Sequence, residues 1–184
     1  MRIVDHWLSG PSWLMTPRAI IIHAVAQRMI ISQWDIDEYG FTEPVGSEVS
    51  NLRYWTVSGL SYHTLVRPGE LINLRHPTQA AQHASGHNGD ALGLAFEVPG
   101  THDWDSFCKY LQSPDWCPHD QIEMAAWWCV QRDRCVGKRL DIYGHDAVDP
   151  EKPDPGRGFA WDVFHSVHHD IKSGRIKGPR HDKS

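Results

Sequence analysis

The segment 144–156, GHDAVDPEKPDPG, combines residue types that could bind a metal ion and act on a substrate. His145 offers an imidazole and Asp154 a carboxylate, and both are good ligands for a divalent ion such as zinc. The prolines on either side of Asp154 restrict its backbone, so the carboxylate would be ordered at little cost. Lys152 would be repelled by a metal ion, but a cation is useful where an oxyanion develops during hydrolysis. Two ligands do not make a metal site, so a third must come from elsewhere.

A buried strand carries another residue that could belong to a site. The run RAIIIH at 18–23 is rich in β-branched residues and has no polar face, which indicates a central strand covered on both sides. His23 would lie at the C-terminal end of this strand, where site residues of α/β sheets are common. Pro99 and Gly100 should end a later strand, at 91–98. The expected further strands are 60–66 and 71–74, which form a hairpin, 91–98, and 139–143, which delivers His145.

Helices are expected on both faces of this sheet. Apolar spacing and end signals predict helices at 47–55, 103–111, 118–135 and 159–171. The inward-facing residues of the last helix are predicted to be Phe159, Val163, Phe164 and Val167. The chain from 24 to 46 is interpreted as a polar connection. Strands mixed with helices indicate an α/β fold with a mixed central β-sheet flanked by helices.

Length and composition limit the function. The 184 residues indicate a single domain, 1–184, with an irregular segment at 1–17 and a basic tail at 172–184. A net charge of -5 argues against nucleic acid as the partner. No apolar run approaches the roughly 20 residues that span a bilayer, which argues against stable membrane insertion. The start, MRIVDHWLSGPSW, lacks the pattern of a secretory signal, so synthesis in a cytoplasm is expected. The four cysteines should then be free thiols.

Four segments, in the same order, resemble a known family: the zinc-dependent type 2 N-acetylmuramoyl-L-alanine amidases of the phage-lysozyme and peptidoglycan-recognition kind. IIIH at 20–23 resembles the strand of the first metal ligand, and SYHTLV at 61–66 resembles a hairpin strand with a tyrosine. HASGHNGDALG at 83–93 is similar to the family's histidine loop. GHDAVDPEKPDPG, followed by FAW at 159–161, resembles the turn that carries the other two ligands and a lysine. The resemblance implies the family's fold, a mixed sheet with helices packed on it.

The resemblance also implies a catalytic metal site. One zinc ion would be held by His23, His145 and Asp154, which leaves a fourth position for water. Zinc lowers the pKa of bound water to about 7, so that hydroxide is available at neutral pH. The attacked carbonyl would be that of the amide between N-acetylmuramic acid and L-alanine in peptidoglycan.

Four further residues receive roles from the resemblance. Lys152 would stabilise the oxyanion, a contact worth roughly 3 kcal/mol. Tyr62 would orient the attacking water or contact the developing charge. His83 and Asn88, in the histidine loop, would bind substrate along the groove.

One position departs from the family pattern. A branch of the family has a glutamate general base directly after the apolar-Gly-apolar run, and this chain has Ala95 there. The phage-lysozyme branch also lacks that acid and relies on the tyrosine and the lysine. Glu97 lies two residues further on, on the same strand face as Ala95, and is an alternative to Tyr62 as the general base.

These observations predict a monomeric amidase that cuts peptidoglycan between glycan and stem peptide. We expect a phage endolysin, made in the host cytoplasm and released to the cell wall. A cytoplasmic enzyme that recycles soluble muropeptides would share the chemistry. A module that binds peptidoglycan without cutting it is the third candidate, but it would need neither the three ligands nor Lys152. The basic tail is either a solvated end of the chain or a segment that is attracted to anionic cell-envelope surfaces.

Overall fold

The fold is built around one mixed sheet, shown in a computed structural model that describes residues 1–9, 13–114 and 116–178. The described residues form seven strands in the order β1-β5-β4-β6-β2-β3, and β7 also pairs with β2. Their bounds are Arg2–Asp5 (β1), Ala19–Ile30 (β2), Glu48–Ser50 (β3), Thr64–Arg67 (β4), Glu70–Asn73 (β5), Ala91–His102 (β6) and Asp141–Gly144 (β7). The predicted mixed α/β architecture is confirmed. Residue 115 lies outside the described residues, as do residues 10–12 and 179–184 of the predicted end segments.

The two longest strands, β2 and β6, lie side by side in parallel at the centre of the sheet. Both were predicted too short. β2 continues past His23 to Ile30, because residues 24–26 are apolar and buried and the next residues pair with β3. β6 continues past Pro99 and Gly100, because the ladder shifts register there and a bulge accommodates both residues. His23 therefore lies in the middle of its strand.

The predicted hairpin is formed by β4 and β5, which are joined by a two-residue turn. Arg67 pairs with Glu70, and Gly69 between them has a φ of 75°, which glycine adopts without steric cost. β4 starts at Thr64 rather than at Leu60, because the residues before it bond elsewhere. The Ser61 N–H donates to the Gln82 carbonyl, for example.

The helices are α1 (Gln33–Tyr39), α2 (Asn51–Ser58), α3 (Trp104–Tyr110), α4 (His119–Val136), α5 (His145–Val148) and α6 (Trp161–Lys172). The prediction missed α1 by treating 24–46 as a polar connection. A capping box of Ser32 and Asp35 begins α1, and Gly40 ends it in the left-handed conformation. The predicted helix at 47–55 begins later, because residues 48–50 form β3 and Ser50 caps α2.

The N-terminal segment 1–17 is not wholly irregular, since β1 pairs in parallel with β5 at the edge of the sheet. Ile3 and Val4 at its centre are β-branched residues that favour strands. Two of the cations expected in the basic tail form ion pairs within the fold. Lys172 pairs with Asp133, and Arg175 pairs with Asp170.

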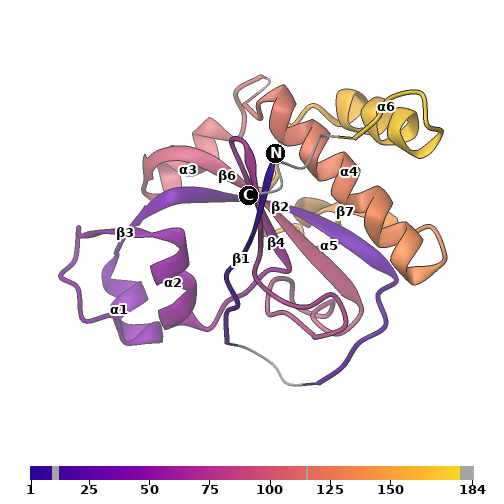
Figure 1. Cartoon of the computed structure of the whole chain (residues 1–184). Coiled ribbons are helices and arrows are strands. Elements are labelled where there is room, and N and C mark those ends of the chain that lie inside the picture. Colours follow the sequence, from indigo (N-terminus) through magenta and orange to yellow (C-terminus); the bar gives the residue numbers. More distant parts are fainter. Residues whose placement is uncertain (10–12, 115, 179–184) are drawn as a thin grey trace.

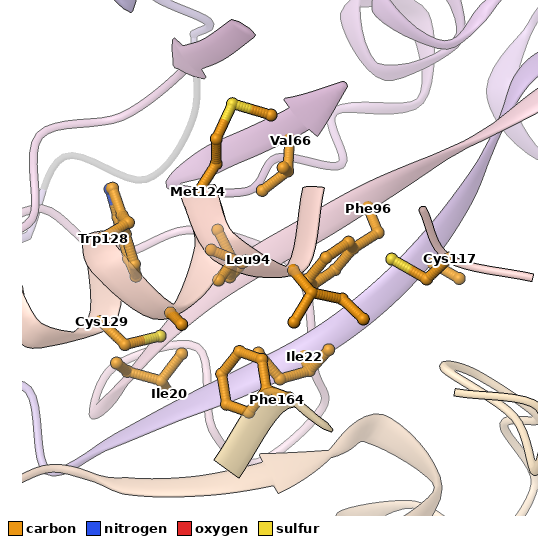
Figure 2. Packing of buried hydrophobic residues seen from close by; sticks show 14 of the residues in the cluster. Ile20, Ile22, Val66, Leu94, Phe96, Cys117, Met124, Trp128, Cys129 and Phe164 are labelled. Atoms are coloured by element: carbon orange, nitrogen blue, oxygen red, sulfur yellow. The ribbon is translucent and has the colours of Figure 1, made fainter. Parts of the chain in front are cut away.

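Helices cover both faces of the sheet, as Figure 1 shows: α4 and α6 (orange to yellow) lie on one side, and α1 and α2 (purple) lie on the other. Alternate residues of β2 serve the two layers, because successive side chains of a strand point to opposite faces. Ile20 and Ile22 face α4 and α6, in the cluster drawn in Figure 2. Val25 faces α2, and His23 lies on that same side of the strand.

No helix among the described residues is long and apolar enough to cross a membrane. All four cysteines are free, as predicted.

The aromatic ring of Phe164 in α6 gives a test of the larger core. Phe164 is 0% exposed, whereas Val163 beside it is 37% exposed, so the prediction that Val163 faces inward is wrong. Phe164→Ala should lower the free energy of unfolding by about 3–5 kcal/mol, because the lost ring leaves a cavity. Val163→Ala is the matched control and should change it by about 0.5 kcal/mol or less. Denaturant melts compare the two, and equal losses would contradict this account of the packing.

Candidate metal centre

Parallel pairing of β7 with β2 brings the first two candidate ligands together. Ile22 of β2 is in register with Gly144, the last residue of β7, so His23 and His145 each directly follow one residue of this pair. The His23 ring is fully buried, and His145 begins the short helix α5 with 8% of its side chain exposed. Their Nδ1 atoms lie 3.1 Å apart.

Asp154 reaches the same point from the turn after α5. Its Oδ2 lies 3.2 Å from His23 Nδ1, and its Oδ1 lies 3.1 Å from His145 Nδ1. The backbone N–H of Ala24 also donates to Asp154 Oδ2, at 3.3 Å. Of the His, Cys, Asp and Glu residues described, His23, His145 and Asp154 are the group whose ligand atoms converge closely enough to hold a metal ion.

The turn that carries Asp154 is held by main-chain contacts. The Asp146 N–H donates to the Asp154 carbonyl at 2.9 Å, and the Trp116 indole N–H donates to the Pro155 carbonyl at 3.1 Å. Glycine is required at Gly158, because an added Cβ would lie only 1.9 Å from the Ser113 carbonyl oxygen. Ser113 and Trp116 thus help to hold the turn that carries Asp154. The sequence analysis gave Trp116 no role, since a single tryptophan carries no signal for such a contact.

The spacing of the three atoms fits a tetrahedral ion. Zinc bonds of about 2.0–2.2 Å at tetrahedral angles place neighbouring ligand atoms roughly 3.3 Å apart. The separations of 3.1 and 3.2 Å between His23, His145 and Asp154 are close to this value. Two imidazoles and one carboxylate leave one position of a tetrahedron open, which is typical of catalytic rather than structural zinc. The residues present therefore fit the predicted ion.

Burial and neighbouring side chains shift the pKa values of two of the ligands. Burial lowers the pKa of His23, because a buried cation loses its hydration, and Asp154 only partly opposes this shift. Burial alone would raise the pKa of Asp154, but contacts with the rings of His145 and His23 hold it well below its usual range. A neutral imidazole and an ionised carboxylate are the forms that bind a metal ion.

Tyr62 is partly exposed beside the metal ligands. Its ring meets that of His23 edge-on, with centroids 4.9 Å apart, and it also packs against the ring of Trp55 of α2. Burial and the charge of Asp154 raise the pKa of the Tyr62 hydroxyl above its ordinary value. The hydroxyl thus stays protonated at neutral pH, so it can donate a hydrogen bond but is a poor general base.

Lys152 and Glu97 differ in how accessible they are. The Lys152 side chain is exposed on the turn that leads into Asp154, and its backbone N–H donates to the Asp149 carbonyl. Ala95 lies in register with His23, and Glu97 lies two residues on, on the same face of β6. The Glu97 carboxylate is buried and accepts a hydrogen bond from the Asn51 side chain at 2.9 Å.

The side chains of His83 and Asn88 both form contacts with other residues of the protein. The His83 ring is buried, with Nδ1 3.0 Å from His23 Nε2 and Nε2 3.0 Å from the Ala91 carbonyl oxygen. The Asn88 side-chain oxygen accepts the backbone N–H groups of His83 and Ala84. Burial, followed by the nearby histidines, lowers the pKa of His83 well below its usual range.

Comparison with known proteins agrees with this geometry. The model of the Amidase_2 family, described as N-acetylmuramoyl-L-alanine amidase, matches residues 13–157. The chain belongs to this family. The match includes His23, His145 and Asp154, and the family assigns peptidoglycan amidase activity to the protein. The predicted family and reaction are thereby confirmed.

Solved structures of amidases share the fold of this Amidase_2 protein. The endolysin amidase LysCS from Clostridium intestinale is 20% identical, with a TM-score of 0.55 over 89% of this chain and 93% of that one. A selenomethionine derivative of AmpD is 19% identical (TM-score 0.58, covering 89% and 93%). The hydrolase AmiA from Staphylococcus aureus is 13% identical (TM-score 0.59, covering 96% and 87%). No curated protein sequence matched the chain. At these identities the structural matches establish the fold alone.

Proposed function

We propose that this amidase is zinc-dependent, that it cuts the amide between N-acetylmuramic acid and L-alanine in intact peptidoglycan, and that it serves as a phage endolysin. The observation that carries the proposal is the convergence of three buried ligand atoms within 3.2 Å, with one tetrahedral position open. A module that only binds peptidoglycan would have no use for such a site. The likeness to an endolysin amidase supports the role in lysis.

The proposed mechanism uses the residues around the three ligands. When bound, zinc would supply Lewis acidity and a water molecule of lowered pKa. The Tyr62 hydroxyl is a donor, so its role is to orient the attacking water or the substrate carbonyl by a hydrogen bond. Lys152 is exposed on the adjacent turn and can move its ammonium group towards the oxyanion as the carbonyl is attacked. The proton taken from the water must finally reach the L-alanine amine that leaves.

Glu97 is poorly placed to act as the general base. It is buried, and its hydrogen bond to Asn51 ties it to α2. Ala95 occupies the strand position directly beside His23 and has no group that could accept a proton.

Digestion of purified sacculi tests the proposed function. The protein should release soluble fragments with new L-alanine N-termini, lose this activity with a chelator, and regain it when zinc is added back. The control is Glu151→Gln, an exposed change on the same turn, which should behave as wild type throughout. Free amine labelling and mass spectrometry identify the bond that is cut.

The other outcomes of this digestion separate the alternatives. Cleavage that survives complete removal of metal would contradict the metal site. Activity on small soluble muropeptides but not on sacculi would instead favour an enzyme of cell-wall recycling. Zinc binding without cleavage of either substrate would favour a recognition module.

A further inference from the structure

A second histidine stands directly behind the metal ligand His23. His23 faces the other ligands with Nδ1, and its opposite ring nitrogen, Nε2, lies 3.0 Å from His83 Nδ1. The far nitrogen of His83 lies 3.0 Å from the main-chain carbonyl oxygen of Ala91. These contacts form a continuous chain from the Ala91 carbonyl through the rings of His83 and His23 to the metal position.

The protons along this line can be assigned by elimination. A carbonyl oxygen can only accept, so His83 Nε2 must carry a proton and donate it to Ala91. A neutral imidazole holds one proton, which leaves His83 Nδ1 as an acceptor. His23 Nε2 must then carry the proton between the two rings, and His23 Nδ1 keeps a free lone pair. That lone pair points at His145 and Asp154, where a metal ion would take it.

We propose that His83 is a positioning residue that fixes His23 in the tautomer able to bind the metal. The outer partner of a ligating histidine sets which ring nitrogen is free and how the ring is oriented. Here that partner is a neutral histidine, anchored in turn on a strand carbonyl. This role differs from the substrate contact expected from the sequence, because both ring nitrogens of His83 are used inside the protein.

The surroundings of His83 leave its ring little freedom. A Cβ at Gly93 would lie 2.7 Å from His83 Cγ, so β6 makes room for the ring at a residue that lacks a side chain. The Gly93 N–H donates to His63 Nδ1 at 2.9 Å, which fixes the strand at this point. Asn88 accepts the His83 backbone N–H at 2.8 Å and shapes the loop. These contacts explain why a buried loop histidine keeps one orientation.

Direct observation of the ring protons tests the inference without any measurement of catalysis. In the full-length protein with 15N-labelled histidine, long-range 1H–15N spectra distinguish a protonated ring nitrogen from a bare one. Both His23 and His83 should be protonated at Nε2, with or without zinc. Protonation of His83 at Nδ1 would overturn the proposal even if no variant of His83 folds.

Two variants separate positioning from simple space filling. His83→Leu fills the site but offers no acceptor, so His23 should populate both tautomers and zinc affinity should fall by about 10–100-fold. His83→Asn places an acceptor oxygen near the former position of Nδ1. It should therefore keep more of the zinc affinity than His83→Leu, although asparagine fills the space less well than leucine. The control is His87→Leu, at a partly exposed position in the same loop, and this variant should bind zinc as wild type does.

Competition with a chromophoric chelator measures the affinities, and thermal melts show that each variant is folded. A folded His83→Leu protein with wild-type zinc affinity, or one that binds better than His83→Asn, would overturn the proposal. The inference rests on the proposed metal site but not on cleavage. A protein that binds zinc and leaves sacculi intact would refute the proposed function and leave the role of His83 standing.

Discussion

Asp154→Ala should abolish cleavage of peptidoglycan, with a fall in turnover of roughly 10³-fold or more, and should release the metal under conditions where the wild type retains it. The carboxylate is the one anionic ligand of the three, and it lies within 3.2 Å of both imidazole nitrogens. Without it, two neutral nitrogens remain, which is fewer than the three protein ligands of catalytic zinc sites. Metal content by elemental analysis and release of fragments from sacculi are the two measurements.

The folded state of this variant needs a separate check, because Asp154 is buried and accepts the Ala24 N–H. Asp154→Asn keeps the size of the side chain and an acceptor oxygen but removes the charge, so it should fold and still lose most of the zinc. Glu151→Gln on the same turn should leave both measurements unchanged. Full activity in a folded Asp154→Ala protein would remove Asp154 from the site.

Lys152→Ala should lower kcat by about 10²–10³-fold while the zinc content stays at the wild-type level. This is the usual loss when one stabilising contact to an oxyanion is removed. KM should change little, because the contact forms mainly as negative charge develops in the transition state. Steady-state kinetics on a soluble muropeptide give both constants.

Lys138→Ala provides the comparison for this substitution, since Lys138 is another exposed lysine, on the loop after α4. The Lys138→Ala protein should keep the wild-type kcat and KM. Loss of zinc from the Lys152→Ala protein would mean that Lys152 supports the turn, and unchanged turnover would remove the proposed oxyanion role.

The sequence predicted those parts of the molecule that have a local signal. The apolar run at 20–22 predicts a central strand, because a strand buried on both faces needs apolar side chains at every position. The apolar stripe of α4 and the turn at Gly69 can likewise be predicted from residues that are close together in the sequence. His145 and Asp154 were suggested by the residue types of one segment, but His23, which lies 122 and 131 residues from them, was joined to them only by the resemblance to a family.

Other features depend on contacts that the local sequence does not show. β1 is a strand because β5 is available to pair with it, and β2 runs past His23 because β3 and β6 extend beside it. The missed helix α1 did carry a signal, the Ser32 and Asp35 capping box with Gly40. The surroundings of His83 could not be predicted, since they require Gly93 and His23 from two different strands.

The wide separation of the three ligands along the chain has a thermodynamic consequence. His23 and Asp154 are 131 residues apart, so their ligand atoms come together only when the sheet and the final turn are both formed. The unfolded chain has no comparable site, and an ion that binds only the native state adds its binding free energy to the stability of the fold. Each tenfold rise in free zinc above Kd then contributes about 1.4 kcal/mol. The catalytic ion would thus also act as a cross-link between β2 and the turn after α5.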